Sequence, residues 1–227
     1  MNQRLNVSRK IALMVAVAAL TLISASITIA DQEATSVSAS EAMRLILDGN
    51  QRFIAGKLEH PNQEPARRDL IAKGQHPFAS ILTCSDSRTA PEILFDRGIG
   101  DIFVVRVAGN VADKVVIESL DYSVEHLGVR FVMVLGHRRC GAVTAAVKGH
   151  DEPGDIGPML TELRPAVKAS KGMPGDPVEN AVRVNVQLVV AKLMHSPELA
   201  PMVHSGKLTV IGGIYDLDSG KIDLLKD

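Results

Sequence analysis

Two short segments of the chain carry side chains that could bind a metal or attack a substrate. They are residues 84–88, CSDSR, and residues 136–141, GHRRCG, and each begins where an apolar run ends. Together they contribute two thiols, Cys84 and Cys140, and the imidazole of His137. Two thiolates and one imidazole form a ligand set typical of zinc. Catalytic zinc keeps its fourth position open, whereas structural zinc is closed by a fourth protein ligand.

Other chemistry is open to these side chains. A single cysteine is more often a small buried hydrophobe than a ligand, so the combination of residues carries more weight than any one of them. Spacing alone favours zinc over a catalytic or redox thiol and leaves both open. A phosphatase-type loop is excluded, because the gap between Cys84 and Arg88 is short and the carboxylate of Asp86 would repel phosphate. Cys84 and Cys140 are the only cysteines, so no disulfide framework is implied.

The elements around these segments must bring the three ligands together. Apolar runs rich in β-branched residues predict four buried parallel strands, and a short fifth run predicts an antiparallel edge strand, at 78–83, 101–107, 131–135, 208–214 and 221–225. One helical pattern precedes the first strand, at 67–73, and others lie between strands, at 111–127, 141–148, 159–169 and 180–194. The sequence therefore predicts an α/β fold with a mainly parallel sheet flanked by helices. The three candidate metal ligands would meet at the carboxyl ends of the strands, with His137 and Cys140 on one side of the first turn of a helix.

An N-terminal helical arm is predicted over residues 38–56. Ser38 and Glu41 form a capping-box pattern at its start. Gly49 interrupts the apolar stripe, so we expect the helix to end or bend there. The arm could pack on its own sheet or lie across another subunit, and both arrangements stay open.

Length, charge and the N-terminal segment indicate the size of the protein, its class and its location. A length of 227 residues fits one large domain or two small ones, and a formal charge of -1 argues against a nucleic-acid partner. Residues 1–30 have a basic start followed by an uncharged apolar run, which predicts a signal peptide or a membrane anchor. Residues 31–40 form a polar linker, and residues 41–227 form the folded domain. We therefore expect export to the bacterial periplasm, with attachment to the inner membrane as the alternative.

Three motifs in this order, within 84–88, 100–110 and 136–141, resemble those of the β-class carbonic anhydrases. The resemblance runs from about residue 40 to the C-terminus. It implies that Cys84, His137 and Cys140 bind one Zn²⁺ per subunit, and that Asp86 and Arg88 form the catalytic dyad. It also implies reversible hydration of CO₂ to bicarbonate and a proton, by attack of zinc-bound hydroxide. Members of the family are homodimers or higher homo-oligomers, with active sites at the subunit interface.

The resemblance also implies a substrate pocket. Its lining residues would be Gln75, Phe103, Ala108 and Tyr122, with an apolar wall suited to CO₂. Members that lock the site with bicarbonate use a Trp, and this chain has none, so the open form of the site is expected. A hydrolase acting on CS₂ or COS, which keeps the same ligands, is the enzyme alternative. A non-catalytic protein with an inert zinc would need a fourth ligand, for which Asp86 is the nearby candidate.

Two further expectations concern the segment between the ligands. Arg138 and Arg139 replace the small residues commoner in the family, and by default they form a solvated surface pair. In an oxidising compartment, loss of zinc would leave Cys84 and Cys140 able to form a disulfide.

Overall fold

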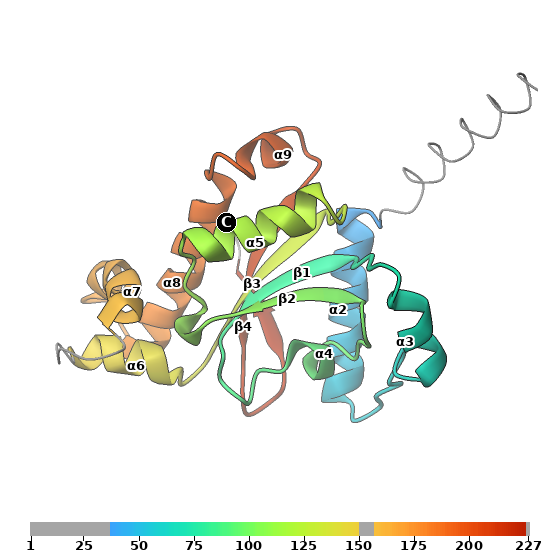
Figure 1. Cartoon of the computed structure of the whole chain (residues 1–227). Coiled ribbons are helices and arrows are strands. Elements are labelled where there is room, and N and C mark those ends of the chain that lie inside the picture. The colour runs from blue at the N-terminus through green and yellow to red at the C-terminus, as the bar shows by residue number, and fades with distance from the viewer. Residues whose placement is uncertain (1–36, 150–156, 226–227) are drawn as a thin grey trace, which may run out of the picture. The chain divides into compact units, whose positions relative to one another are not determined.

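A five-stranded sheet lies at the centre of the computed structural model, which describes residues 37–149 and 157–225 (Figure 1). Its strands, in the order β2-β1-β3-β4-β5, are β2 (Ile102–Arg106), β1 (Ala79–Thr83), β3 (Phe131–His137), β4 (Thr209–Tyr215) and β5 (Ile222–Leu224). Neighbouring strands run parallel except for β5, which is antiparallel to β4. The predicted α/β fold is confirmed, with four parallel strands and one antiparallel edge strand. The predicted signal peptide or anchor, at residues 1–30, lies outside the described residues.

The central strands β1 and β3 are buried because helices cover both faces of the sheet, whereas β2, expected to be buried, and the edge strand β5 are mostly partly exposed. Every position of β1 and β3 is buried. Successive side chains of a strand point to opposite faces, so alternate residues of β3 belong to two separate hydrophobic clusters. Val132 and Val134 face one cluster, while Phe131, Met133 and Leu135 face the other. This two-sided burial is why the strands are continuous apolar runs rather than alternating ones.

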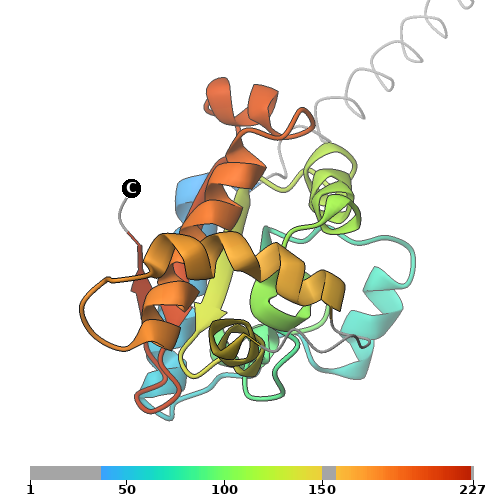
Figure 2. The ribbon, with the colours of Figure 1, turned by 90° about the vertical axis from the view of Figure 1, so that its left-hand side faces the viewer.

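Helices far apart in the sequence form the two outer layers. One face is covered by α5 (Lys114–Glu125) and α8 (Pro177–Met194), and α6 (Gly141–Lys148) and α7 (Gly157–Ser170) pack beside α8. The other face is covered by α2 (Ala39–Ile54) and α4 (Pro91–Leu94). Figure 2 shows α8 in front of the sheet and α2 behind it. The sequence did not predict α4 or α9 (Ala200–His204), whereas α3 (Pro65–Ile71) was expected. A 3₁₀ turn, η1 (Ala108–Asn110), follows β2.

Helix α2 begins as predicted and ends at Ile54, close to the predicted end at residue 56. The Ser38 hydroxyl accepts a hydrogen bond from the Glu41 N–H at 3.2 Å, which caps the helix. The helix packs on its own sheet through Ala42 and Ile46, both fully buried. The predicted end or bend at Gly49 is wrong, because α2 runs straight through this position to Ile54.

The reason for a glycine at position 49 is close packing. A Cβ atom at Gly49 would lie 1.7 Å from the carbonyl oxygen of Phe95, at the end of α4. Glycine therefore lets α2 approach the α4 segment, and this contact needs no break in the helix. Within the described residues no helix is both long and apolar enough to cross a membrane.

Candidate metal centre

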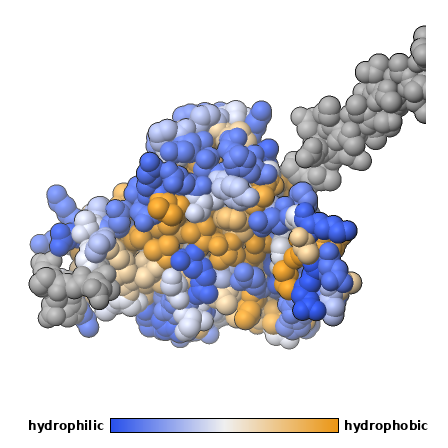
Figure 3. All heavy atoms as spheres, in the orientation of Figure 1, coloured by the Kyte–Doolittle hydropathy of each residue, from blue (hydrophilic) through white to orange (hydrophobic). Residues whose placement is uncertain are grey.

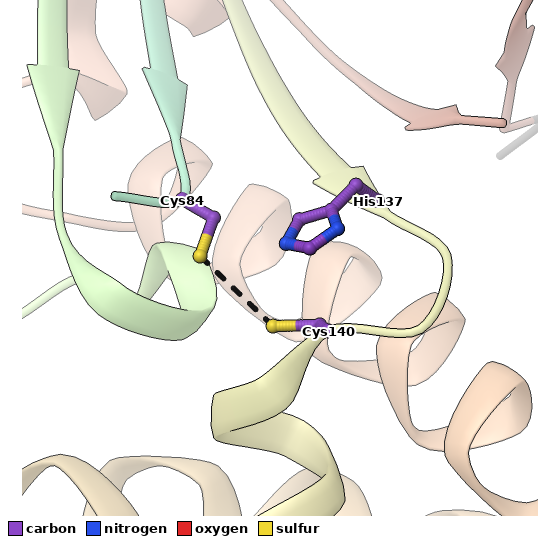
Figure 4. Close-up of side chains that lie close together, drawn as sticks. All are labelled: Cys84, His137 and Cys140. Carbon is purple, nitrogen blue, oxygen red and sulfur yellow. Dashed lines mark hydrogen bonds between the residues drawn. The ribbon is translucent and has the colours of Figure 1, made fainter. Parts of the chain in front are cut away.

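Cys84, His137 and Cys140 come together at the carboxyl ends of β1 and β3 (Figure 4). Their ligand atoms all lie within 4.8 Å of one another, and the two Sγ atoms are 4.0 Å apart. All three side chains are buried. The predicted convergence of these residues is confirmed. It follows from the parallel register of β1 and β3, which aligns Thr83 with Leu135 near the ends of both strands.

The local geometry of His137 and Cys140 differs from the predicted helical turn. His137 is the last residue of β3, and Cys140 is the N-cap residue of α6. Arg138 and Arg139 form the turn between them, and Arg139 has a φ of 52°. His137 at the strand end and Cys140 at the helix cap are joined by a turn with one left-handed residue, Arg139. This turn lets the imidazole and the thiol point to the same place.

The imidazole of His137 is oriented by the main chain. Its Nδ1 lies 2.9 Å from the carbonyl oxygen of Arg138, so Nδ1 carries the proton and donates it to this oxygen. Nε2 is buried and has no hydrogen-bond partner. A buried imidazole nitrogen without a proton or a partner is unfavourable unless it binds a metal. This orphaned nitrogen therefore points to a metal ligand.

The two thiols differ in their electrostatic surroundings. A hydrogen bond from the Cys140 thiol lowers the pKa of Cys84 to about 4, aided by the backbone N–H groups of Asp86 and Gly109. The N–H groups lie 3.4 and 3.2 Å from Cys84 Sγ. A hydrogen bond to the Cys84 thiolate raises the pKa of Cys140, and burial adds to this effect. Two adjacent thiolates repel each other, so only a cation between them would allow both to ionise.

The residues present fit a zinc ion. Tetrahedral Zn²⁺ with bonds of about 2.3 Å to sulfur would hold two sulfur atoms roughly 3.8 Å apart. The observed separation of 4.0 Å between Cys84 and Cys140 agrees with this value. Two thiolates and one neutral imidazole also match the ligand chemistry of zinc.

Asp86 and Arg88 form an ion pair at the edge of the centre. Hydrogen bonds from the Arg88 side chain hold the pKa of Asp86 well below its usual range. Asp86 Oδ2 lies 3.8 Å from His137 Nε2, while both carboxylate oxygens are engaged by Arg88. Among the described residues, the candidate ligand group comprises the two cysteines and the histidine without Asp86. This geometry weighs against an inert zinc closed by Asp86 as a fourth ligand.

Several residues that support the centre were not identified from the sequence. Arg106, at the end of β2, donates from Nε to the Cys84 carbonyl at 3.1 Å and from Nη2 to the Asp86 carbonyl at 2.7 Å. The Thr89 hydroxyl donates to the same two carbonyls. These contacts fix the loop that carries Cys84 and Asp86. Arg106 lies within the motif at 100–110, which could have drawn attention to it.

Of the predicted pocket residues, Ala108 lies beside the metal centre of its own chain, whereas Phe103 and Tyr122 lie away from it. Ala108 begins η1, whose Gly109 N–H donates to Cys84, so it lies beside the metal centre. Phe103 pairs with Ser80 in the sheet register, four residues before Cys84, or roughly 13 Å along the strand. The ring centroids of Phe103 and Tyr122 are 6.3 Å apart.

Gln75 also lies away from the metal centre of its own chain. It is exposed and precedes the amino end of β1, whereas Cys84 follows the carboxyl end. A single chain therefore does not bring Gln75, Phe103 and Tyr122 onto the centre that it contributes to.

Arg138 and Arg139 are more than a solvated pair. Arg139 donates from Nη1 and Nη2 to the two carboxylate oxygens of Asp218, both at 2.8 Å. Arg138 Nη1 lies 3.2 Å from Asp216 Oδ2. The backbone N–H of Arg139 donates to Glu179 Oε1 at 2.9 Å. Both arginine side chains are solvent-exposed as expected, at 43% and 54%, and in addition they pair with acidic residues of α8 and of the turn after β4.

The chain is similar to a protein family, to individual proteins and to solved structures. A family model described as "Carbonic anhydrase" matches residues 79–222. Carbonic anhydrase 2 of Mycobacterium tuberculosis is 38% identical over 185 residues, which cover 79% of this chain and 89% of that protein. A carbonic anhydrase of Mycolicibacterium smegmatis is 37% identical over 188 residues, covering 81% and 91%. The crystal structure of a β-carbonic anhydrase of Aspergillus fumigatus superimposes with a TM-score of 0.65 at 29% identity, covering 79% of this chain and 88% of that one.

Proposed function

Because this chain belongs to the β-class carbonic anhydrases, a family of zinc enzymes, we propose that it interconverts CO₂ and bicarbonate at the site formed by Cys84, His137 and Cys140. One observation carries the assignment of the site. The unpartnered Nε2 of His137 is buried beside two thiols, with an acceptor, Asp86, 3.8 Å away. A zinc ion held by these three residues would supply a Lewis acid that activates water as the nucleophile toward CO₂.

Asp86 acts as the group that orients the nucleophile. An ionised carboxylate can only accept hydrogen bonds, so Asp86 accepts a hydrogen bond from the attacking group, which leaves an oxygen lone pair of that group directed at CO₂. Arg88 keeps Asp86 ionised and holds it in one orientation through two hydrogen bonds. Arg106 holds the backbone on either side of Ser85, through the carbonyls of Cys84 and Asp86. The loop therefore presents the carboxylate in a fixed position, which contributes to catalysis by preorganisation.

A second copy of the chain completes the pocket in this proposal. Phe103 and Tyr122 lie at β2 and α5, and Figure 3 shows apolar side chains gathered over this part of the molecule. β2 is an edge strand of the sheet, so one side of β2 has no neighbouring strand among the described residues. Val115 on α5 is 68% exposed, and Tyr122 is 46% exposed. A homo-oligomer that covers this face would bury these apolar groups and bring the partner's Gln75, Phe103 and Tyr122 to the metal centre.

We also propose that the protein is exported. The support comes from the sequence of residues 1–30, in which a basic start precedes an uncharged apolar run. N-terminal sequencing of the mature protein tests cleavage, since an intact Met1 would rule it out. Fractionation of the periplasm and the inner membrane distinguishes a released protein from an anchored one.

The proposed reaction is tested by stopped-flow measurement of CO₂ hydration on purified protein, with zinc content determined on the same sample. We expect about one zinc per subunit and rapid hydration. The same sample is offered COS and CS₂. A zinc-loaded protein that hydrolyses these compounds and leaves CO₂ unchanged would overturn the proposal in favour of the hydrolase alternative.

A further inference from the structure

The turn between the histidine and cysteine ligands offers both of its carbonyl groups to the metal centre. The Arg138 carbonyl accepts a hydrogen bond from His137 Nδ1 at 2.9 Å. The Arg139 carbonyl accepts a long hydrogen bond, 3.5 Å, from Nη2 of Arg88. The position of this two-residue turn therefore affects both the imidazole and the cation that holds Asp86.

The side chains of the same turn are anchored outside the centre. Arg139 forms a two-point pair with Asp218, and its N–H donates to the carboxylate of Glu179. Arg138 pairs with Asp216, and its own N–H donates to the Tyr215 carbonyl at 3.0 Å. Glu179 lies in the first turn of α8, and Asp216 and Asp218 lie in the turn between β4 and β5. Two elements distant in sequence thus hold one turn.

The backbone of the turn needs such support. Arg139 has a φ of 52°, in the left-handed region that side chains other than Gly, Asn and Asp rarely adopt. A residue in this conformation persists only where its surroundings hold it. A glycine or another small residue would supply the same carbonyls without these anchors, so the two arginine side chains add a restraint on the turn.

We propose that Asp218 and Glu179 are positioning residues of the metal centre, which hold Arg139 in its left-handed conformation and thereby fix His137 and Arg88. The inference rests on the zinc site of the proposed function but not on the reaction catalysed there. The competing explanation is an incidental surface pair, since Arg139 and Asp218 are 54% and 70% exposed and exposed pairs contribute little. The two-point geometry and the third anchor at the backbone N–H argue against it.

Release of zinc to a chromophoric chelator tests this role without any substrate. Four variants are compared with the wild type. D218N removes the charge of the anchor, and R139N removes the clamp while keeping a residue that tolerates the left-handed backbone. R139D/D218R restores the pair with its charges reversed, and aspartate also tolerates this backbone. E41Q is the matched control, because it removes the charge from another exposed two-point pair, Glu41 with Arg44, on α2.

We expect zinc release to be about tenfold faster in D218N and R139N, the lower end of effects seen for groups that orient metal ligands. Release should return toward the wild-type rate in R139D/D218R and stay unchanged in E41Q. With zinc in excess, the free energy of unfolding should fall in D218N and R139N by no more than about 1.4 kcal/mol, which is a tenfold weaker binding expressed as free energy. A larger fall would show general destabilisation instead of positioning and would overturn the inference. Equal release rates in D218N and the wild type would overturn the inference. An equal acceleration in E41Q, or no recovery in the reversed pair, would also overturn it, whereas a wild type that binds no zinc would instead overturn the proposed function.

Discussion

The Arg88 guanidinium donates two hydrogen bonds to the Asp86 carboxylate, from Nε to Oδ1 at 2.9 Å and from Nη2 to Oδ2 at 2.7 Å. The backbone N–H of Arg88 donates a third, to Oδ1 at 3.0 Å. Together they keep Asp86 ionised and oriented, 3.8 Å from the nitrogen of His137 that lacks a partner. The ion pair thus fixes Asp86, beside the candidate ligands, to the loop that carries both residues. Asp86 is therefore the first target for mutation.

The substitution Asp86→Asn should retain zinc and lose most of the activity. The amide keeps the shape of the side chain but loses the charge and one acceptor, so it no longer orients the nucleophile. We expect kcat/KM for CO₂ hydration to fall about a hundredfold. Zinc content measured on the same sample is the control. Near-normal turnover of the metal-loaded variant would remove Asp86 from the mechanism.

Removal of zinc should make the two cysteines sensitive to oxidation. Their Sγ atoms are only 4.0 Å apart, and Cys84 is held as the more acidic thiol. Treatment of the chelated protein with oxidised glutathione should convert both thiols to a disulfide, with two molecules of glutathione released as the reduced product. A thiol reagent should then detect neither cysteine until a reductant is added, while the zinc-loaded protein stays protected. Two free thiols after chelation and oxidation would dispose of this prediction.

The substitution Gly49→Ala should destabilise the protein although alanine is the better helix former. The added Cβ would lie 1.7 Å from the Phe95 carbonyl oxygen, which belongs to the backbone and cannot rotate away. We expect the free energy of unfolding to fall by about 3 kcal/mol, which outweighs the gain of about 1 kcal/mol in helix propensity. Gly74→Ala is the control, since a Cβ there would meet no atom within 4 Å. Equal urea midpoints for the two variants would show that α2 and α4 can move apart.

The substitution Asp96→Asn should lower stability in a way that depends on pH. The Asp96 side chain is 1% exposed and pairs with Arg52 at 2.6 Å. Burial alone would raise the pKa of Asp96, but hydrogen bonds from Arg52 and from the N–H groups of Glu59 and His60 outweigh it and lower the pKa.

The sign of this dependence follows from the lowered pKa in the folded state. The carboxylate contributes its full stabilisation above the unfolded pKa, about 3.9, and loses it as the pH falls through the lower folded value. We expect Asp96→Asn to cost about 2 kcal/mol at pH 7 and the difference from the wild type to shrink below about pH 4. Urea unfolding at several pH values measures it. Asp48→Asn, which breaks an exposed pair with Arg44, should change little. A difference that grows in acid would contradict the assignment.

A charge on the exposed face of α5 should dissociate the proposed oligomer and reduce activity with it. Val115 is 68% exposed and has no assigned role in the reaction. We expect Val115→Asp to lower the mass measured by light scattering and to reduce CO₂ hydration, because the partner's Phe103 and Tyr122 would leave the pocket. Leu224→Asp, on β5 at the opposite end of the sheet order, should keep both the mass and the activity. A fully active monomer would show that one chain forms the whole site.

The strands and the three ligands could be predicted because they depend on local patterns. Buried parallel strands are continuous apolar runs, and the segments that carry Cys84 and His137 follow two such runs directly. The rule that parallel strands end at one rim then places these residues together without any knowledge of distances.

The features that could not be predicted depend on contacts between segments far apart in the sequence. The role of Gly49 is set by a carbonyl of α4, and the anchors of Arg139 come from α8 and the turn after β4. No periodicity in the sequence reports such contacts. Phe103 lies away from the ligands of its own chain, and a motif gives the order of residues along β2 but not the subunit that they face.

X-ray absorption at the zinc edge of the purified protein tests the metal centre most directly. We predict a first shell of about two sulfur atoms near 2.3 Å, from Cys84 and Cys140, with one imidazole nitrogen and one light atom from solvent. Substitution of His137 by Ala should remove the imidazole signal and leave the sulfur contribution. A shell with no sulfur, or one closed by four protein ligands, would contradict a catalytic zinc at this site.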